Sequence, residues 1–282
     1  MKSENSMKSF RKSNLILILW MIIWTGTFLS CENSSAEKDF KPGDIRENIK
    51  DTFNYLPTST TGEIVFHKYY SLSYNEEYEN PEWVAYSLSP KQISRAQRER
   101  PYFIRDPKVS TGSAHYKNYY PNGYEKGHLV PAADRRFSEE AFEETFYTSN
   151  VAPMDHYFNA GIWNDLEKQV RYWAKRYGKL YVVTGGVLKP GLERIGREDV
   201  AVPDEFYKII LDYNNPKHPK MIGFLIKHHD SLVSPEVFAV PVDSIEKITG
   251  IDFFPALPDS IENKLEKTAN TKPWKFVHFE RY

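Results

Sequence analysis

The chain has 282 residues, of which 40% are hydrophobic and 15% aromatic, so it is long enough to bury one large hydrophobic core. Its formal net charge of −1 lacks the positive excess typical of proteins that bind nucleic acid stoichiometrically. A single cysteine excludes a disulfide within the chain. These properties count against a basic binding module, but they are compatible with an enzyme that needs only a local positive groove.

The first thirty residues have the pattern of an export signal. An apolar run from Leu15 to Leu29 follows a basic segment and is too short for a comfortable membrane span. We therefore expect residues 1–30 to be a lipoprotein-type signal peptide, with Cys31 attached to a membrane through a lipid. An ordinary signal peptide and an uncleaved anchor are the alternatives. The lipoprotein signal predicts an exported protein that is lipid-anchored in a bacterial cell envelope, in the periplasm or on the outer surface.

Residues 31–61 are polar and are predicted to form a flexible tether, within which residues 44–55 have the pattern of a short helix. The remaining residues, 62–282, are predicted to form one domain. Residues 63–74 and 83–88 are rich in β-branched and aromatic side chains, and we expect them to pair as strands.

Strands and helices are both predicted in the rest of the chain. Ser138 is a predicted N-cap, because acidic residues fill the turn that follows it. His228 and His229 lack a third ligand at a suitable spacing, so we interpret them as strand-end residues rather than metal ligands. The predicted fold is α+β, with a central, mostly antiparallel sheet flanked by helices. The elements are strands at 179–188, 205–213 and 220–228 (the last two as a hairpin), helices at 242–249 and 258–267, and a docked aromatic tail at 274–282.

A helical run starting at Asn159 carries two candidate functional residues. Apolar side chains recur every three or four positions as far as Tyr177, which indicates one apolar helix face. Glu167 lies within about 80° of Asn159 around the helix but about 12 Å along its axis. This geometry favours one direct metal ligand and one that acts through water, a sparse arrangement that suits Mg²⁺. The alternative is that Asn159 caps the helix and Glu167 is a solvated residue.

His128 is the candidate base. Gly127 before it indicates a tight backbone, and Pro131 after it indicates an extended exit. A histidine held there can take a proton from water near neutral pH. A structural role is the alternative for this residue taken alone.

Basic and aromatic side chains precede and surround His128. Tyr116, Tyr119 and Tyr120 are suited to stack on bases, although packing against the fold is the favoured interpretation. The basic residues would form a local positive groove, with a solvated surface as the alternative for some of them. They are Arg95, Arg98, Arg100, Arg105, Lys108, Lys117, Lys126, Arg135 and Arg136.

Three motifs follow one another in the chain: Glu-Lys-Gly-His-Leu-Val-Pro-Ala-Ala-Asp at 125–134, Ser-Asn-Val-Ala-Pro at 149–153, and Asn-(x)3-Trp-(x)2-Leu-Glu at 159–167. In order and spacing they resemble the DNA/RNA non-specific endonuclease family, which includes secreted bacterial nucleases and mitochondrial endonuclease G. The similarity extends over residues 62–266. It implies a ββα-metal active site, in which His128 lies on a hairpin-like arm facing the helix of Asn159.

The resemblance implies a role for each motif residue. His128 matches the general base, Asn159 the side chain that ligates the divalent ion directly, and Glu167 the acid that holds a metal-bound water. Arg100 best matches an upstream arginine of the family, with Arg98 and Arg105 as nearby rivals. The implied cofactor is Mg²⁺, with Mn²⁺ as a substitute.

The chain departs from the family pattern at three positions. The family has Asp-Arg-Gly-His where this chain has Glu-Lys-Gly-His. Lys126 keeps the positive charge but loses the planar, bidentate fork of arginine, and Glu125 keeps the acid on a longer arm. Met154 replaces a glutamine. These departures affect the expected rate more than the reaction type.

The predicted function is divalent-metal-dependent hydrolysis of phosphodiester bonds in DNA and RNA with little sequence specificity. Lys126 and Arg100 would offset charge on the phosphate. Two alternatives remain open at this stage: a phosphodiesterase on a small nucleotide substrate, and a surface lipoprotein that binds nucleic acid without cleaving it. The second does not require the set of His128, Asn159 and Glu167.

Overall fold

The computed structural model describes residues 53–280. The predicted signal peptide, the lipid site at Cys31 and the tether up to residue 52 lie outside these residues. Residues 53–55, at the end of the predicted helix 44–55, are not helical. Among the described residues, no helix has the length and apolar character needed to cross a bilayer.

Seven antiparallel strands form the central sheet, in the spatial order β1-β2-β3-β6-β9-β10-β11. The predicted hairpin of residues 205–213 and 220–228 is confirmed, with Glu205 of β9 opposite Lys227 of β10. The strands are β1 (Glu63–Phe66), β2 (Ser71–Asn75), β3 (Asn80–Leu88), β6 (Leu180–Gly186), β9 (Glu205–Asp212), β10 (Lys220–Lys227) and β11 (Ala239–Val240).

The single strand predicted at residues 63–74 is instead two strands, β1 and β2, which pair with each other. The chain reverses at residues 67–70, where the backbone N–H of His67 donates to the carbonyl of Tyr70 at 2.9 Å. These four residues include no glycine or proline, so the sequence carries no turn signal there. The predicted pairing with the next strand is confirmed, because β2 pairs with β3.

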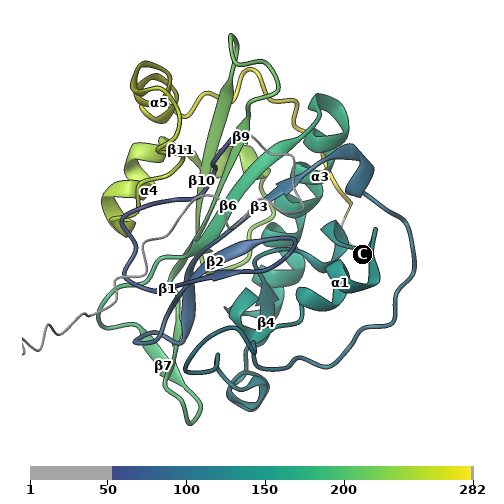
Figure 1. Ribbon diagram of the computed structural model, residues 1–282, viewed down its shortest axis with the longest axis vertical. Helices are drawn as coiled ribbons and strands as arrows, with labels where there is room; N and C mark the ends of the chain where they lie inside the picture. The colour runs from purple at the N-terminus through teal and green to yellow at the C-terminus, as the bar shows by residue number, and fades with distance from the viewer. Residues whose placement is uncertain (1–52, 281–282) are drawn as a thin grey trace, which may run out of the picture. The chain divides into compact units, whose positions relative to one another are not determined.

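Side chains alternate between the two faces of the sheet, and helices cover both faces. On β9, Phe206 and Ile210 join the core under α3, whereas Tyr207 and Ile209 join the core under α4. Figure 1 shows α1 and α3 on one side of the sheet and α4 and α5 on the other, so the predicted α+β architecture is confirmed. The helices are α1 (Glu139–Glu144), α3 (Asn164–Tyr177), α4 (Val242–Thr249) and α5 (Asp259–Glu266).

The aromatic C-terminal segment docks beside α3. Trp274 is buried, and its ring centroid lies 4.7 Å from that of Trp173. The side chains of Gln169 and Trp173 both donate to the carbonyl of Lys275, at 3.0 and 2.7 Å. These bonds hold the segment against the helix, as its aromatic composition predicts.

The first described residues also pack on the sheet, on the face covered by α4. The Phe53 ring lies 5.2 Å from Tyr181 and 4.9 Å from Tyr213, and the Tyr55 ring lies 5.0 Å from Tyr181. The packed body therefore begins before residue 62, where the sequence placed the end of the tether. Residues 31–61 are polar on average, so the composition of this segment does not indicate that the aromatic residues near its end are packed.

Two short antiparallel strand pairs complete the fold. The first pairs β4 (Glu125–His128) with β5 (Val151–Met154), and we call it a hairpin although residues 129–150, which include α1, connect its strands. The second pairs β7 (Glu193–Ile195) with β8 (Val200–Val202). β5 leads into α2 (His156–Phe158), a single turn that continues into a π-helical segment, Asn159–Trp163, and then α3. This succession places the candidate histidine and asparagine on neighbouring elements.

Candidate active site

The β4–β5 hairpin is closely packed at Gly127. A Cβ atom on this glycine would lie 2.1 Å from the Sδ atom of Met154 and 2.3 Å from its Cγ atom. Met154 is fully buried, so its side chain fills the space over the Gly127 backbone. Residue 127 must therefore be glycine for β4 to lie against β5 and present His128 at its end.

The His128 ring lies between two phenylalanines. Its centroid is 5.3 Å from that of Phe103 and 5.1 Å from that of Phe146. Among the described residues, no hydrogen-bond partner reaches the Nε2 atom, which is buried. Burial, followed by the charges of Arg100 and Lys126, lowers the pKa of His128 to about 3. The imidazole is therefore neutral across the physiological pH range, as a general base must be.

Arg100 and Lys126 converge on the same aromatic pair. The guanidinium carbon of Arg100 lies 5.7 Å from the Phe146 ring centroid, and Lys126 Nζ lies 5.2 Å from that of Phe103. Arg100 is exposed and free to meet an anion, and Lys126 is half-buried. Burial is the main cause of the lowered pKa of Lys126. The structure thus brings together three of the five predicted site residues.

Asn159 is tied to β4 by Glu125. The Nδ2 atom of Asn159 donates to Glu125 Oε2 at 2.7 Å, while Glu125 Oε1 lies 2.8 Å from Nδ1 of His156. Because a carboxylate only accepts hydrogen bonds, this contact orients the Asn159 amide with Nδ2 toward Glu125 and leaves Oδ1 as the available acceptor. The longer arm of Glu125 therefore still connects the first and third motifs.

The segment that carries Asn159 is not a regular α-helix. Residues 159–163 form a π-helical turn, and Gly161 has non-helical dihedral angles, φ −91° and ψ −114°. The continuous helix predicted from Asn159 therefore begins only at Asn164. Such turns concentrate at functional sites because they redirect side chains. Trp163 closes the turn by donating from Nε1 to the carbonyl of His128 at 3.2 Å.

His228 supports this segment from the end of β10. Its Nε2 atom accepts the backbone N–H of Asp155 at 2.7 Å, and Asp155 in turn caps α2 by accepting from the backbone of Tyr157 and Phe158. Burial lowers the pKa of His228, which keeps its ring neutral and able to accept. The interpretation of His228 as a strand-end residue is confirmed, and the structure adds its link to the turn before Asn159.

Glu167 lies in a cluster of buried charges at the start of α3. Its Oε2 atom is 3.8 Å from Arg171 Nη1, which also bonds Asp134 Oδ1 at 2.8 Å. Burial raises the pKa of Glu167 to about 7, against the attraction of Arg171 and Lys208. Burial also lowers the pKa of Lys208 to about 8. Glu167 is therefore a mixture of protonated and ionised forms near neutral pH.

Lys208 is the site-related residue that the sequence did not single out. It is fully buried on β9, with Nζ 3.2 Å from Thr184 Oγ1 and 4.4 Å from the centroid of the Trp163 ring. Its position alternates with Tyr207 and Ile209, so it faces α3. A lysine inside an apolar strand was the available signal, because lysine is almost never fully buried without a partner.

The profile of the DNA/RNA non-specific endonuclease family matches residues 50–260. The chain belongs to this family. This endonuclease is 34% identical to the mitochondrial nuclease EXOG of Danio rerio over 243 residues, 80% of this chain and 70% of that protein. It is 31% identical to human EXOG over 232 residues, 76% of this chain and 62% of that protein. It is 32% identical to human mitochondrial endonuclease G over 200 residues, 66% of this chain and 67% of that protein.

A solved structure gives the same result. A chain from the crystal structure of an EndoG/EndoGI complex, which concerns the mechanism of EndoG inhibition, matches with a TM-score of 0.67 and 30% sequence identity. The match covers 71% of the endonuclease and 88% of that chain. The predictions of the family, of the fold and of an enzyme that hydrolyses nucleic acid phosphodiester bonds are confirmed. Nothing in these comparisons supports the small-substrate phosphodiesterase or the binding lipoprotein.

The predicted location of the protein is wrong. The expected location in a bacterial cell envelope is contradicted by the relatives, because EXOG, endonuclease G and a Saccharomyces cerevisiae relative are all named as mitochondrial nucleases. That location was inferred from composition in residues 1–31 alone, and the comparisons give no support to a lipid on Cys31.

Several basic residues of the predicted groove have other roles in the endonuclease. Arg98 pairs with Glu139, and Arg105 pairs with Glu198. Arg135 is fully buried and donates to the carbonyls of Asp134, Tyr69 and Ser87.

The three tyrosines considered for base stacking, Tyr116, Tyr119 and Tyr120, differ in exposure. Tyr119 is fully buried, as the packing interpretation expected, whereas Tyr120 is 81% exposed.

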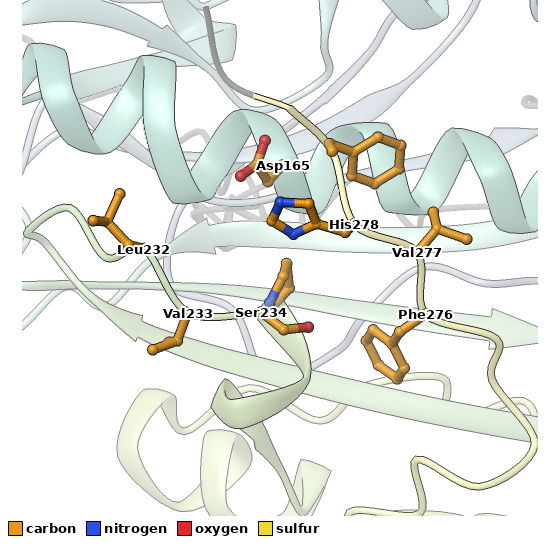
Figure 2. A pocket seen from close by; sticks show the side chains of 9 residues that line it. Asp165, Leu232, Val233, Ser234, Phe276, Val277 and His278 are labelled. Atoms are coloured by element: carbon orange, nitrogen blue, oxygen red, sulfur yellow. The ribbon is translucent and has the colours of Figure 1, made fainter.

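Two hollows lie in the described part of the chain near α3 and near the turn before Asn159. One, of about 480 Å³, lies between α3 and the C-terminal segment, and Figure 2 shows Asp165 and His278 on its wall with the apolar Leu232, Val233 and Phe276. Another, of about 740 Å³, adjoins the hairpin and the turn before Asn159, and its lining includes three acids, Asp155, Glu193 and Asp230.

Proposed function

We propose that this endonuclease cleaves DNA and RNA with His128 as the general base. The base takes a proton from the water that attacks phosphorus. The ring is neutral and so can accept a proton, and an anionic phosphate bound beside Arg100 and Lys126 would offset the positive charges that, after burial, lower the pKa of His128. The flanking rings of Phe103 and Phe146 hold the imidazole in place. General-base catalysis of this kind contributes about 10²- to 10⁴-fold.

The donor set around Asn159 fits a divalent cation. Its amide is oriented by Glu125, so Oδ1 is the atom that would hold the ion, and an amide oxygen is a ligand that hard cations accept. We propose Mg²⁺, with Mn²⁺ as a substitute, because one amide oxygen leaves most positions to water. When bound, the ion supplies positive charge to the phosphate and to the leaving oxygen.

Arg100 and Lys126 bind and neutralise the phosphate in this proposal. Both lie around the ring pair that holds His128, so a phosphate between them is also close to the base. Contacts to phosphate carry little sequence information, which accounts for weak sequence preference. Lys126 acts as a point charge and does not reproduce the bidentate fork of arginine.

Glu167 acts as a positioning residue in this proposal. Its carboxylate orients water at the start of α3, and it does so when ionised. Arg171 and Lys208 favour the ionised form, against the effect of burial. These two cations therefore support the site from the core without contacting substrate.

One observation carries the proposal. The 2.7 Å hydrogen bond between Glu125 and Asn159 joins the strand that ends in His128 to the segment that would hold the ion. Glu125 and Asn159 are 34 positions apart in sequence, and their hydrogen bond links the strand of the neutral base to an oriented amide oxygen. A protein that only binds nucleic acid has no need of either.

The test is digestion of plasmid DNA and of RNA by the purified protein with Mg²⁺, Mn²⁺ or EDTA. We expect metal-dependent cleavage of both polymers, reduced at least about 100-fold by His128→Ala and by Asn159→Ala. His229→Ala and Asn270→Ala are matched controls, because both residues are exposed, and they should keep full activity. A folded His128→Ala protein that cuts at the wild-type rate would exclude His128 as the base.

A further inference from the structure

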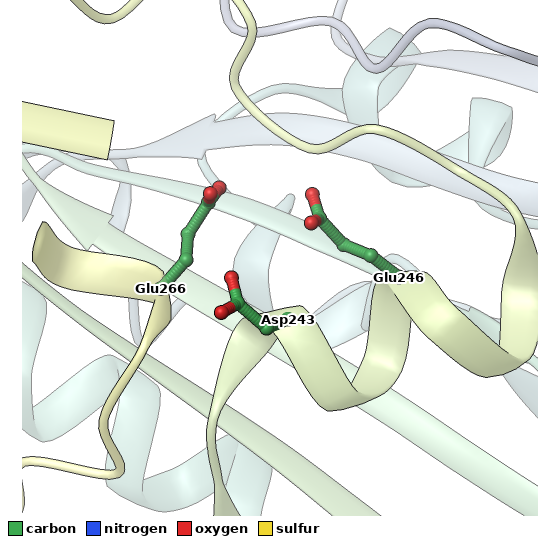
Figure 3. Close-up of side chains that lie close together, drawn as sticks. All are labelled: Asp243, Glu246 and Glu266. Atoms are coloured by element: carbon green, nitrogen blue, oxygen red, sulfur yellow. The ribbon is translucent and has the colours of Figure 1, made fainter. Parts of the chain in front are cut away.

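Three carboxylates converge on the side of the sheet opposite to α3. Asp243 and Glu246 come from α4, and Glu266 comes from the end of α5. Figure 3 shows their side chains directed into one space between the two helices. One oxygen from each residue lies within 4.8 Å of the others. These residues have no part in the reaction proposed for His128.

Glu266 has the environment of a ligand rather than that of a surface acid. It is 6% exposed, and its Oε1 atom is buried with no hydrogen-bond partner among the described residues. Burial and the neighbouring acids Glu246, Glu262, Asp243 and Asp252 raise its pKa to about 8. A buried carboxylate without a partner is costly, and a cation would offset both its desolvation and its repulsion by these acids.

We propose that Asp243, Glu246 and Glu266 form a calcium site that is separate from the active site and joins α4 to α5. Ca²⁺ binds oxygen ligands at about 2.3–2.6 Å, so ligand atoms on one ion lie up to about 5 Å apart, which matches the spacing of these oxygens. Three carboxylates can supply up to six of the six to eight oxygens that Ca²⁺ takes.

The unequal exposure of the three residues suits a partly hydrated ion. Asp243 is exposed and Glu246 is half-buried, so water can reach the site from the side of α4 and complete the ion's shell. Glu246 Oε1 already accepts the backbone N–H of Phe253 at 2.9 Å, which holds that carboxylate in place. Mg²⁺ fits less well, because it demands near-ideal octahedral geometry with ligands at about 2.0–2.1 Å.

The experiment measures Ca²⁺ binding by calorimetry and Ca²⁺-dependent thermal unfolding. The full chain is stripped with EDTA and carries Asn159→Ala, so that the proposed catalytic ion does not contribute. We expect one Ca²⁺ per chain and a higher melting temperature with CaCl2. Glu266→Gln should weaken Ca²⁺ binding by at least about tenfold and remove the thermal response. Glu236→Gln, which changes an exposed glutamate and alters the net charge equally, should retain both.

Each outcome decides the proposal. The absence of Ca²⁺ binding to the folded Asn159→Ala protein, or an unchanged response in Glu266→Gln, would overturn it. If Glu266→Gln does not fold, Asp243→Asn replaces it, because Asp243 is exposed and its loss should leave the fold intact while weakening Ca²⁺ binding. A failure of the catalytic proposal does not affect this result, since the assay involves no cleavage.

Discussion

At the scale of single residues, burial shifts the proton affinity of three side chains around the active site. The pKa of His128 falls to about 3, that of Lys208 falls to about 8, and that of Glu167 rises to about 7. In each case burial is the largest cause, since it disfavours the charged form. The proposed base, His128, is therefore neutral at any physiological pH, whereas the ionisation of Glu167 changes within that range.

This difference predicts the pH dependence of cleavage. Glu167 is ionised above pH 7 and protonated below it, so kcat/KM should fall roughly tenfold from pH 8 to pH 6 with the metal kept saturating. Glu167→Gln should lower the rate at pH 8 and flatten the profile. His128 cannot produce the acidic limb, because it stays neutral down to about pH 3.

The control is Glu193→Gln, which removes an exposed carboxylate on β7. Its profile should keep the fall below pH 7. A profile of Glu167→Gln that still falls tenfold between pH 8 and pH 6 would show that another group controls the reaction.

The sequence alone indicates some residues of the proposed site and not others. His128 and Asn159 stand in motifs with characteristic neighbours and spacing, so the sequence alone indicates them as candidates. Lys208 carries a weaker signal, a lysine inside an apolar strand, and only the register of β9 shows that it faces α3 and reaches the Trp163 ring. Arg135 was wrongly grouped with surface cations, because nothing local in the sequence indicates that its guanidinium is buried against carbonyl groups.

At the scale of elements, the proposed active site depends on a hairpin and a π-helical turn. The hairpin was foreseeable only from the family resemblance, because β4 and β5 have four residues each and contain no alternating pattern. The turn at Asn159–Trp163 has the apolar period of a helix, so the sequence predicts a regular helix there. Trp163 donates to the carbonyl of His128 and the backbone of Asp155 donates to His228, and these contacts hold the turn in its irregular form. Both partners are distant in sequence, so the local sequence pattern cannot predict the turn.

Packing of the hairpin can be tested at Gly127. Gly127→Ala should lower the free energy of unfolding by about 1–3 kcal/mol and reduce cleavage, because the new methyl group overlaps Met154. Met154→Ala should cost about 2–5 kcal/mol by leaving a cavity. The double variant should lose less stability than the sum of the two, since the alanine at 127 occupies part of that cavity. Chemical denaturation of the four proteins measures this coupling, and strict additivity would contradict the proposed contact.

At the scale of the whole molecule, the sheet separates two regions with different roles. The face under α3 carries the core of the proposed active site, and the face under α4 carries the packed start of the body and the proposed calcium site. Both faces are buried, so β9 and β6 are apolar nearly throughout, which made them easy to predict. The start of the body was harder to predict, because Phe53 and Tyr55 are stabilised by Tyr181 and Tyr213, which lie more than a hundred positions away in sequence.

This packing predicts that stability and activity respond differently to truncation. A protein that begins at residue 62 should unfold at a temperature lower by about 5–15 °C than one that begins at residue 50, because two aromatic side chains leave the sheet. Phe53→Ala with Tyr55→Ala in the longer protein should reproduce most of the loss. Cleavage at low temperature should change little, since His128 and Asn159 depend on the other face of the sheet. Differential scanning calorimetry and plasmid digestion on the same samples measure the two effects. Equal stability of the two lengths would place the start of the stable body at residue 62, as the composition alone suggests.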